Sequence, residues 1–364
     1  MTILGILVIL SFIGCTKQSK PEPVNVILIS IDALRADYLN SYGYSKDKVS
    51  PNIDALGRDG ILHMNHITAS PWTTPSHMSL LTSMHPSSHG VIQSFQEFYE
   101  AMAGRGKFNS LAEERLTLSE ALKANGYSTG AFTGGITLDG KIGFDQGFLT
   151  YMSDMYKISD SNMGRMLEWV DRHAGEPFFL FWHTFEVHAP YLSGDLLGDD
   201  RAGLREELDQ LRAKIGDEGS LAHHVNAGMF FKRLLKRHSA LNLDVCTTLY
   251  AGGVLSVDRW IGRLVAFLKE RNLYDRTLIV LTSDHGEEFA DHDPQKFYDE
   301  HGHSAYEEMI RIPLIVKLPK SRHAGLRIQS PSRAIDVMPT VLDVAGIVLK
   351  EHEMQGESLV SLWE

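Results

Sequence analysis

Cysteine is scarce in this chain: Cys15 and Cys246 are the two cysteines among 364 residues. Two thiols cannot form the several bridges that hold a small disulfide-rich domain together. Hydrophobic residues make up 43% of the chain, which at this length is enough to bury a large core. The sequence therefore predicts a fold stabilised by apolar packing, and Cys246, which lies in a helical pattern, is expected to pack within it.

Positive charge is also in short supply, because 35 Lys and Arg residues face 46 Asp and Glu residues, for a formal net charge of −11. Nucleic acid and anionic lipid surfaces would be repelled at long range, so neither is expected as a charge-driven partner. Histidine, in contrast, is plentiful, with 17 residues. Histidines beside Asp, Glu and Gly make metal chemistry the first possibility to consider.

An apolar run long enough to span a bilayer is missing at the N-terminus. Residues 3–13 are mostly apolar, whereas a membrane-spanning helix needs about 20 such residues. The run ends at Gly14-Cys15 and resembles a bacterial lipoprotein signal, in which the cysteine becomes the lipidated N-terminus. We expect residues 1–15 to be a signal peptide, residues 16–23 a polar tether, and the protein to be exported and anchored in the cell envelope through lipid on Cys15. An ordinary signal peptide is the alternative.

Three short apolar runs predict strands buried in a parallel sheet: residues 24–31, 177–183 and 277–282. Each is followed closely by polar residues, which are Asp32 after the first, Glu186 and His188 after the second, and Asp284 and His285 after the third. Ligands bind outside the carboxyl ends of the strands in open α/β sheets. We therefore expect these side chains to meet at one edge of the sheet.

Helical patterns lie between the predicted strands, at residues 116–125, 161–173 and 249–270. This alternation predicts one α/β domain over residues 24–364, with a central, mostly parallel sheet flanked by helices. A polar insertion of mixed charge near residues 194–242 interrupts the pattern. It is expected to form either a lid or rim over the site or a solvated excursion on the surface.

A hydroxyl-rich motif, Ser-Pro-Trp-Thr-Thr-Pro-Ser-His at residues 70–77, precedes a short apolar helix. Together with residues 25–37 and the Ser-Asp-His-Gly-Glu segment at residues 283–287, it resembles the sulfatase branch of the alkaline phosphatase superfamily. The resemblance covers nearly all of residues 24–362. It implies the α/β sandwich of that superfamily and a metal-dependent ester hydrolase.

Thr73 stands where sulfatases carry a Cys or Ser that is oxidised to formylglycine. Threonine has a methyl group on its β-carbon, so oxidation would give a ketone and not the aldehyde whose hydrate performs sulfatase chemistry. Thr73 instead resembles the threonine of phosphodiesterase relatives, whose alkoxide attacks phosphorus directly. His77 stands where the family has an arginine, and we expect it to bind substrate.

The resemblance implies a first metal site made of Asp32, Thr73, Asp284 and His285. Sulfatases place a second Asp directly after the first, and here that position is Ala33. One carboxylate fewer favours Zn²⁺ or Mn²⁺ over Ca²⁺, with Mg²⁺ also possible.

A second metal ion would use Glu186, His188 and His301, because phosphodiesterase relatives supply a carboxylate and two histidines from this region. With a single metal, these residues would bind substrate oxygens or transfer protons instead. His188 and His303 are the candidates for the general acid, since imidazole titrates nearest to neutral pH. His303 is also expected to bind substrate.

These features predict a hydrolase with one or two divalent ions that cleaves an anionic phosphate or phosphonate ester through a covalent Thr73 intermediate. A threonyl sulfate would be a stable ester, with no formylglycine hydrate to release it, so phosphoesters are favoured. Two alternatives stay open: a sulfatase that works without formylglycine, and a catalytically inactive surface lipoprotein that binds a glycan.

The N-terminal pattern leads to a first prediction. Replacing the acceptor thiol by Cys15→Ala should abolish incorporation of radioactive fatty acid and release soluble protein or unprocessed precursor from the membrane fraction. Unchanged labelling of the variant would contradict the assignment of Cys15 as the lipidation site.

Overall fold

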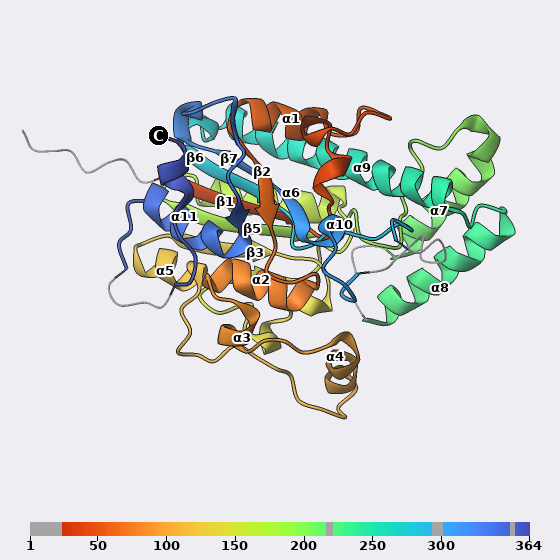
Figure 1. Ribbon diagram of the computed structural model, residues 1–364, viewed down its shortest axis with the longest axis horizontal. Coiled ribbons are helices and arrows are strands. Elements are labelled where there is room, and N and C mark those ends of the chain that lie inside the picture. Colours follow the sequence, from red (N-terminus) through yellow and green to blue (C-terminus); the bar gives the residue numbers. More distant parts are fainter. Residues whose placement is uncertain (1–23, 216–220, 293–300, 350–353) are drawn as a thin grey trace, which may run out of the picture.

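A single twisted sheet of nine strands forms the centre of the protein (Figure 1). The computed structural model describes residues 24–215, 221–292, 301–349 and 354–364. The strand order is β4-β3-β5-β1-β6-β7-β2-β8, with β9 beside β2. The strands are β1 Asn25–Ile31, β2 Ile61–Ile67, β3 Ser128–Phe132, β4 Thr150–Met152, β5 Phe178–Thr184, β6 Thr277–Thr282, β7 Arg311–Lys317, β8 Leu326–Ile328 and β9 Ser332–Arg333. Every pairing is parallel except those of β7 with β6 and β2, which confirms the predicted, mostly parallel sheet.

Helices cover both faces of the sheet. They are α1 Pro51–Arg58, α2 Thr73–Thr82, α3 Pro86–His89, α4 Phe95–Met102, α5 Leu118–Ala124, α6 Asp160–Arg172, α7 Ala202–Ile215, α8 Leu221–Arg237, α9 Leu243–Glu270, α10 Glu307–Ile310 and α11 Val337–Val344. Ile27 and Ile29 of β1 pack in one core with residues of α1, α6 and α9, whereas Val26 and Leu28 pack in another with residues of α2, α5 and α11. Because alternate side chains of β1 enter opposite cores, this strand must be apolar throughout.

The predicted helices are present, with differences at their ends. α5 and α6 match the predicted ranges closely, but α9 begins at Leu243, ahead of the predicted start at residue 249. Asn242 explains that start, since its side-chain oxygen accepts a hydrogen bond from the Val245 N–H at 3.0 Å and caps the helix. Cys246 is a fully buried residue of α9, as its apolar surroundings led us to expect.

The insertion near residues 194–242 consists mainly of α7 and α8, which lie together at one end of the molecule (Figure 1). Residues 1–23, with the predicted signal peptide, the tether and Cys15, lie outside the described residues. Within the described ranges, no helix combines the length and the apolar character needed to cross a membrane.

Two glycines in α9 allow a loop from the site to lie directly against this helix. A Cβ atom on Gly252 would come within 2.3 Å of the Ser193 carbonyl oxygen, and one on Gly253 within 3.2 Å of the Glu186 carbonyl oxygen. Both contacts involve backbone of the segment that follows β5. Any larger residue at these positions would therefore push that segment, and His188 with it, away from α9.

This close approach can be tested with a matched pair of helical glycines. Gly164→Ala in α6 has open space around the new Cβ, so it should stabilise the protein by about 0.5–1 kcal/mol. Gly252→Ala should instead destabilise it by roughly 1–3 kcal/mol, since the backbone must move to make room. Urea denaturation of both variants measures the difference, and equal stabilisation by both would contradict the packing described here.

Candidate active site

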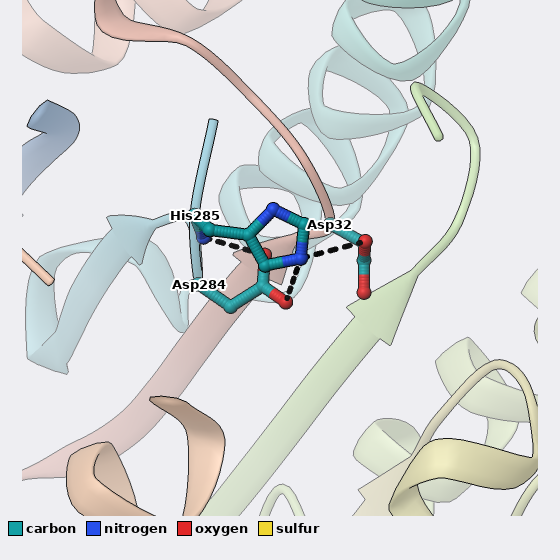
Figure 2. Close-up of side chains that lie close together, drawn as sticks. All are labelled: Asp32, Asp284 and His285. Carbon is teal, nitrogen blue, oxygen red and sulfur yellow. Dashed lines mark hydrogen bonds and ion pairs between the residues drawn. The ribbon is translucent and has the colours of Figure 1, made fainter. Parts of the chain in front are cut away.

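The candidate site lies at the carboxyl ends of β1 and β6, which are neighbours in the sheet (Figure 2). Asp32 directly follows β1, and Asp284 and His285 follow β6 after one intervening residue. One ligand atom from each of these three buried residues lies within 4.8 Å of the other two. The parallel arrangement of the two strands thus brings together residues that are about 250 positions apart in the chain.

Hydrogen bonds determine which atom of each residue faces the middle of this cluster. Asp284 Oδ1 accepts from the backbone N–H groups of Ala33, at 3.1 Å, and His285, at 2.9 Å. His285 Nδ1 lies 2.8 Å from the Gly286 carbonyl oxygen, so it carries the ring proton and leaves the Nε2 lone pair free. Asp284 Oδ2 and His285 Nε2 therefore both point into the cluster.

The inward-facing atoms fit a bound cation. Asp32 Oδ1 and Asp284 Oδ2 are buried and have no hydrogen-bond partner among the described residues. His285 Nε2 lies 3.8 Å from the first oxygen and 3.3 Å from the second. Three electron-pair donors that face each other away from water are costly unless a positive charge lies between them. Two carboxylate oxygens and an imidazole nitrogen are a suitable donor set for a divalent metal ion.

The pKa values of Asp32 and His285 reflect the same burial and repulsion. Burial, together with the neighbouring charge of Asp284, raises the pKa of Asp32 well above its usual value. Burial lowers the pKa of His285 to about 4, so this imidazole is neutral near pH 7 and able to bind a metal. A divalent ion would remove the repulsion that otherwise favours a proton on Asp32.

Thr73 is the first residue of α2, and its Oγ1 lies 3.2 Å from His285 Nε2. The helix N-terminus adds a partial positive charge that favours an anionic oxygen there. Ser76 ties the start of the helix to the cluster, because its hydroxyl donates to the Asp284 carbonyl oxygen at 2.7 Å. Thr73, Asp32, Asp284 and His285 are therefore one compact group, as the family resemblance implied.

Two further histidines lie behind this group. His183, at the end of β5, accepts a hydrogen bond from the Gly134 N–H on Nδ1 at 3.2 Å, so its Nε2–H donates to Asp32 Oδ2 at 3.1 Å. His77 lies 2.9 Å from the Thr73 carbonyl oxygen through Nδ1 and 2.8 Å from the Ser30 hydroxyl through Nε2. Both rings are completely buried. His77, expected to bind substrate, thus orients Thr73 from behind, and His183 was not anticipated, although it ends an apolar run of the sequence.

Three histidines lie on the open side of the group. His188 Nε2 is 4.0 Å from Asp32 Oδ1, and its Nδ1 is 2.6 Å from the Ala189 carbonyl oxygen. The His301 ring stacks on that of His285, with centroids 4.5 Å apart, and its Nδ1 lies 2.9 Å from a Glu287 carboxylate oxygen. His303 Nε2 is 2.7 Å from the Glu288 carboxylate. All three border the same cavity as Thr73.

Glu186, expected as a ligand of a second metal, is not brought to this group. One carboxylate oxygen accepts from the Ile158 N–H at 3.0 Å, and the other lies 2.8 Å from the Ser256 hydroxyl and 2.6 Å from the Arg212 guanidinium. Burial would raise its pKa, but the charges of Arg212 and Lys157 lower it overall. The contacts of Glu186 are those of a buried structural ion pair, so its carboxylate does not face the group around Thr73.

Lys157 holds the loop that carries His188. Its ammonium group is buried and donates to the backbone carbonyl oxygens of Phe185, at 2.6 Å, and His188, at 2.9 Å. Burial lowers the pKa of Lys157 to about 7. Carbonyl groups that point inward in this way require a donor, so Lys157 fixes the path of the chain between β5 and the insertion.

A cavity of about 820 Å³ opens over Thr73. Its lining includes the three histidines, residues before α4 and in α4, residues of α8, and Ile136, Thr137, Tyr156 and Phe185. The insertion that contains α8 therefore contributes a rim to the site.

Comparisons with known proteins place this geometry in context. A family model described as Sulfatase matches residues 24–347. The chain is 27% identical over 387 aligned residues to the multifunctional alkaline phosphatase superfamily protein PehA of Trinickia caryophylli, covering 88% of this chain and 74% of that protein. It is 24% identical to an ulvan-active sulfatase of Formosa agariphila, covering 95% of this chain and 66% of that protein. The chain thus spans about two thirds to three quarters of the length of these relatives.

Solved structures show the same fold. The phosphonate monoester hydrolase of Agrobacterium radiobacter has a TM-score of 0.66 and 22% identity, covering 93% of this chain and 77% of that chain. A protein solved in complex with its substrate D-glucosamine-2-N,6-O-disulfate has a TM-score of 0.70 and 20% identity, covering 94% of this chain and 80% of that chain. Both phosphonate and sulfate chemistry therefore occur among proteins of this architecture.

The donor set predicts the metal content of variants. Asp284→Asn and His285→Ala should each lose most of the bound metal, measured by plasma mass spectrometry after dialysis, because each removes an inward-facing donor. Glu186→Gln is the matched buried control and should retain the metal of the wild type. A loss of one metal equivalent in Glu186→Gln would contradict its structural role and restore the two-metal interpretation.

Proposed function

The chain belongs to the sulfatase family, and we propose that it is a metal-dependent hydrolase that cleaves phosphate or phosphonate esters through nucleophilic attack by Thr73. One observation supports this most: a hydroxyl that cannot be converted to formylglycine lies 3.2 Å from His285 Nε2, beside two carboxylate oxygens that have no hydrogen-bond partner among the described residues. The family-model match over residues 24–347 shows that the chain is a hydrolase of this family. The preference for phosphorus over sulfur is our proposal.

The metal would be held by Asp32, Asp284 and His285, with Thr73 beside them, and Zn²⁺ or Mn²⁺ suits this mixture of oxygen and nitrogen donors. Such an ion supplies positive charge that acidifies the Thr73 hydroxyl and offsets the charge of the substrate oxygens. His183 holds Asp32 through its Nε2–H, and Ser76 holds the loop of Asp284, so the donors are fixed before substrate binds.

The Thr73 hydroxyl loses its proton to water, and its oxygen forms a bond to phosphorus while the bond from phosphorus to the ester oxygen breaks. The departing oxygen then takes a proton from an imidazole. Burial lowers the pKa of His188 well below its usual value, so this ring is neutral near pH 7 and a poor acid. His303, which lines the cavity and lies 2.7 Å from the Glu288 carboxylate, is the proton donor that we propose. Water then hydrolyses the threonyl phosphate and regenerates Thr73.

Sulfate esters are the second candidate, because an ulvan-active sulfatase is among the relatives. Thr73 argues against them on chemical grounds. The β-carbon of threonine carries a methyl group, so the aldehyde hydrate of formylglycine cannot form, and a threonyl sulfate would have no elimination route for its release. A threonyl phosphate, in contrast, is open to direct attack by water at phosphorus.

We also propose that the protein acts in the cell envelope, exported by its N-terminal signal and anchored through lipid on Cys15. The apolar run ending at Gly14-Cys15 and the polar stretch after it support this location. An anionic ester outside the cytoplasm would then be its substrate.

Comparing esters of the same phenol tests the assignment. We expect wild-type protein to cleave an aryl phosphodiester or phosphonate monoester with a higher kcat/KM than the aryl sulfate, since a shared leaving group cancels its own reactivity. Thr73→Ser should retain measurable activity, because the hydroxyl remains, and Thr73→Ala should lose several orders of magnitude. Faster turnover of the sulfate, with Thr73 unmodified by mass spectrometry, would show that the protein is a sulfatase.

A further inference from the structure

Apolar and aromatic side chains make up much of the cavity lining beside Thr73 and the three histidines. The main ones are Trp72, Ile92, Tyr99, Phe185, Met229 and Phe231. Some of them lie against the histidines themselves, since the Phe185 ring packs edge-on to that of His188 and the Trp72 ring stacks on that of His301. A ligand whose anionic group lies beside Thr73 would therefore extend along an apolar surface.

Two polar side chains in this wall are already engaged with the protein. The Gln93 amide donates to the Lys107 carbonyl oxygen at 3.0 Å and accepts from the Asn109 N–H at 3.0 Å. The Ser94 hydroxyl caps α4 and donates to the Glu97 carboxylate at 2.8 Å. These engaged groups offer few partners to the closely spaced hydroxyl groups of a sugar, which need partners when they leave water. The Thr137 hydroxyl, which also lines the cavity, has no hydrogen-bond partner among the described residues and could serve a single polar group.

Two large apolar side chains that line the cavity are also exposed to solvent. Ile92, ahead of α4, is 62% exposed, and Met229, on α8, is 49% exposed. Apolar surface that gathers around the mouth of a binding cavity marks a place where a ligand is buried.

Charge in the wall is limited. Among the described residues that line the cavity, Lys232 is the one lysine or arginine. A ligand with several sulfate or phosphate groups would need more cations than this, whereas a single anionic group is served by the metal cluster itself. The charge distribution thus favours a ligand with one anionic end.

We propose that this cavity selects esters whose organic group is apolar, an alkyl chain or an aromatic ring system, lodged between the segment around Ile92 and Tyr99 on one side and α8 on the other. The proposal rests on the proposed function, since it assigns the organic part of the ester that Thr73 attacks. A volume of about 820 Å³ accommodates a group of this kind together with the anionic end. An apolar lining should bind a bare sugar ester no more tightly than a methyl ester.

Calorimetric titration of the metal-loaded Thr73→Ala variant, which lacks the proposed nucleophile and so leaves the esters intact, with methyl, butyl and hexyl phosphate and with glucose 6-phosphate tests the proposal directly. The dissociation constant should fall about fourfold for each added methylene group. Glucose 6-phosphate should bind no more tightly than methyl phosphate. Equal affinity along the alkyl series, or tighter binding of the sugar phosphate than of hexyl phosphate, would overturn the proposal.

Measuring binding with Thr73→Ala and turnover with the wild type separately distinguishes a failure of this inference from a failure of the proposed function on which it rests. A protein that binds the alkyl series with the expected gradient but hydrolyses no phosphoester would contradict the proposed function alone. A protein that hydrolyses phosphoesters but shows no gradient would contradict the apolar cavity alone.

Substitutions of the exposed apolar residues that line the cavity test where the alkyl group binds. Ile92→Ser and Met229→Ser change exposed side chains, so both variants should keep the melting temperature of the wild type while losing about tenfold in affinity for hexyl phosphate and little for methyl phosphate. Leu149→Ser is the matched control, because Leu149 is also 62% exposed but does not line the cavity. Unchanged affinity for hexyl phosphate in both rim variants, or an equal loss in the control, would overturn the proposal.

Discussion

Two buried carboxylates that face each other without a proton donor between them determine much of the structure around them. Asp32 and Asp284 repel each other in a region of low dielectric, and burial adds to the cost of their charges. The rigid pairing of β1 with β6 prevents them from moving apart. His183 and the N–H groups of Ala33 and His285 satisfy the outer oxygens. The inner oxygens are placed where they could hold a cation, and Thr73 lies beside them, which is the basis of its proposed role as the nucleophile.

The fold could be predicted from the sequence because its central strands are apolar on both faces. In a long chain, strands of this kind are buried mainly in a parallel sheet that is covered by helices on both faces. Asp32, Asp284 and His285 could also be placed, since polar residues directly after such strands meet at one edge. The role of Thr73 needed the family resemblance, because nothing in its local pattern distinguishes it from other threonines at helix starts.

The residues around β5 were harder to predict. His183 belongs to the strand and faces Asp32, whereas Glu186 lies beyond it and pairs with Arg212 of α7. A sequence reveals that a carboxylate follows a strand, but not that a guanidinium from a distant insertion will reach it first. The insertion could not be assigned as rim or surface from its sequence either. Its many charged residues give no sign of which apolar side chains, such as Met229, border the cavity.

The division of the site between chain segments has a consequence for how relatives of this protein can diverge. The proposed metal donors and Thr73 come from strand ends and from α2, whose geometry the whole sheet maintains, while His303 comes from the segment before α10. One wall of the cavity comes instead from a contiguous insertion whose two helices, α7 and α8, pack on each other. Mutation of the cavity-lining residues of α8 would alter the shape offered to the organic part of a substrate, provided that Arg212 of α7 still pairs with the buried Glu186 and supports the segment of His188. Selection could thus produce new specificities in this lineage without passing through inactive intermediates.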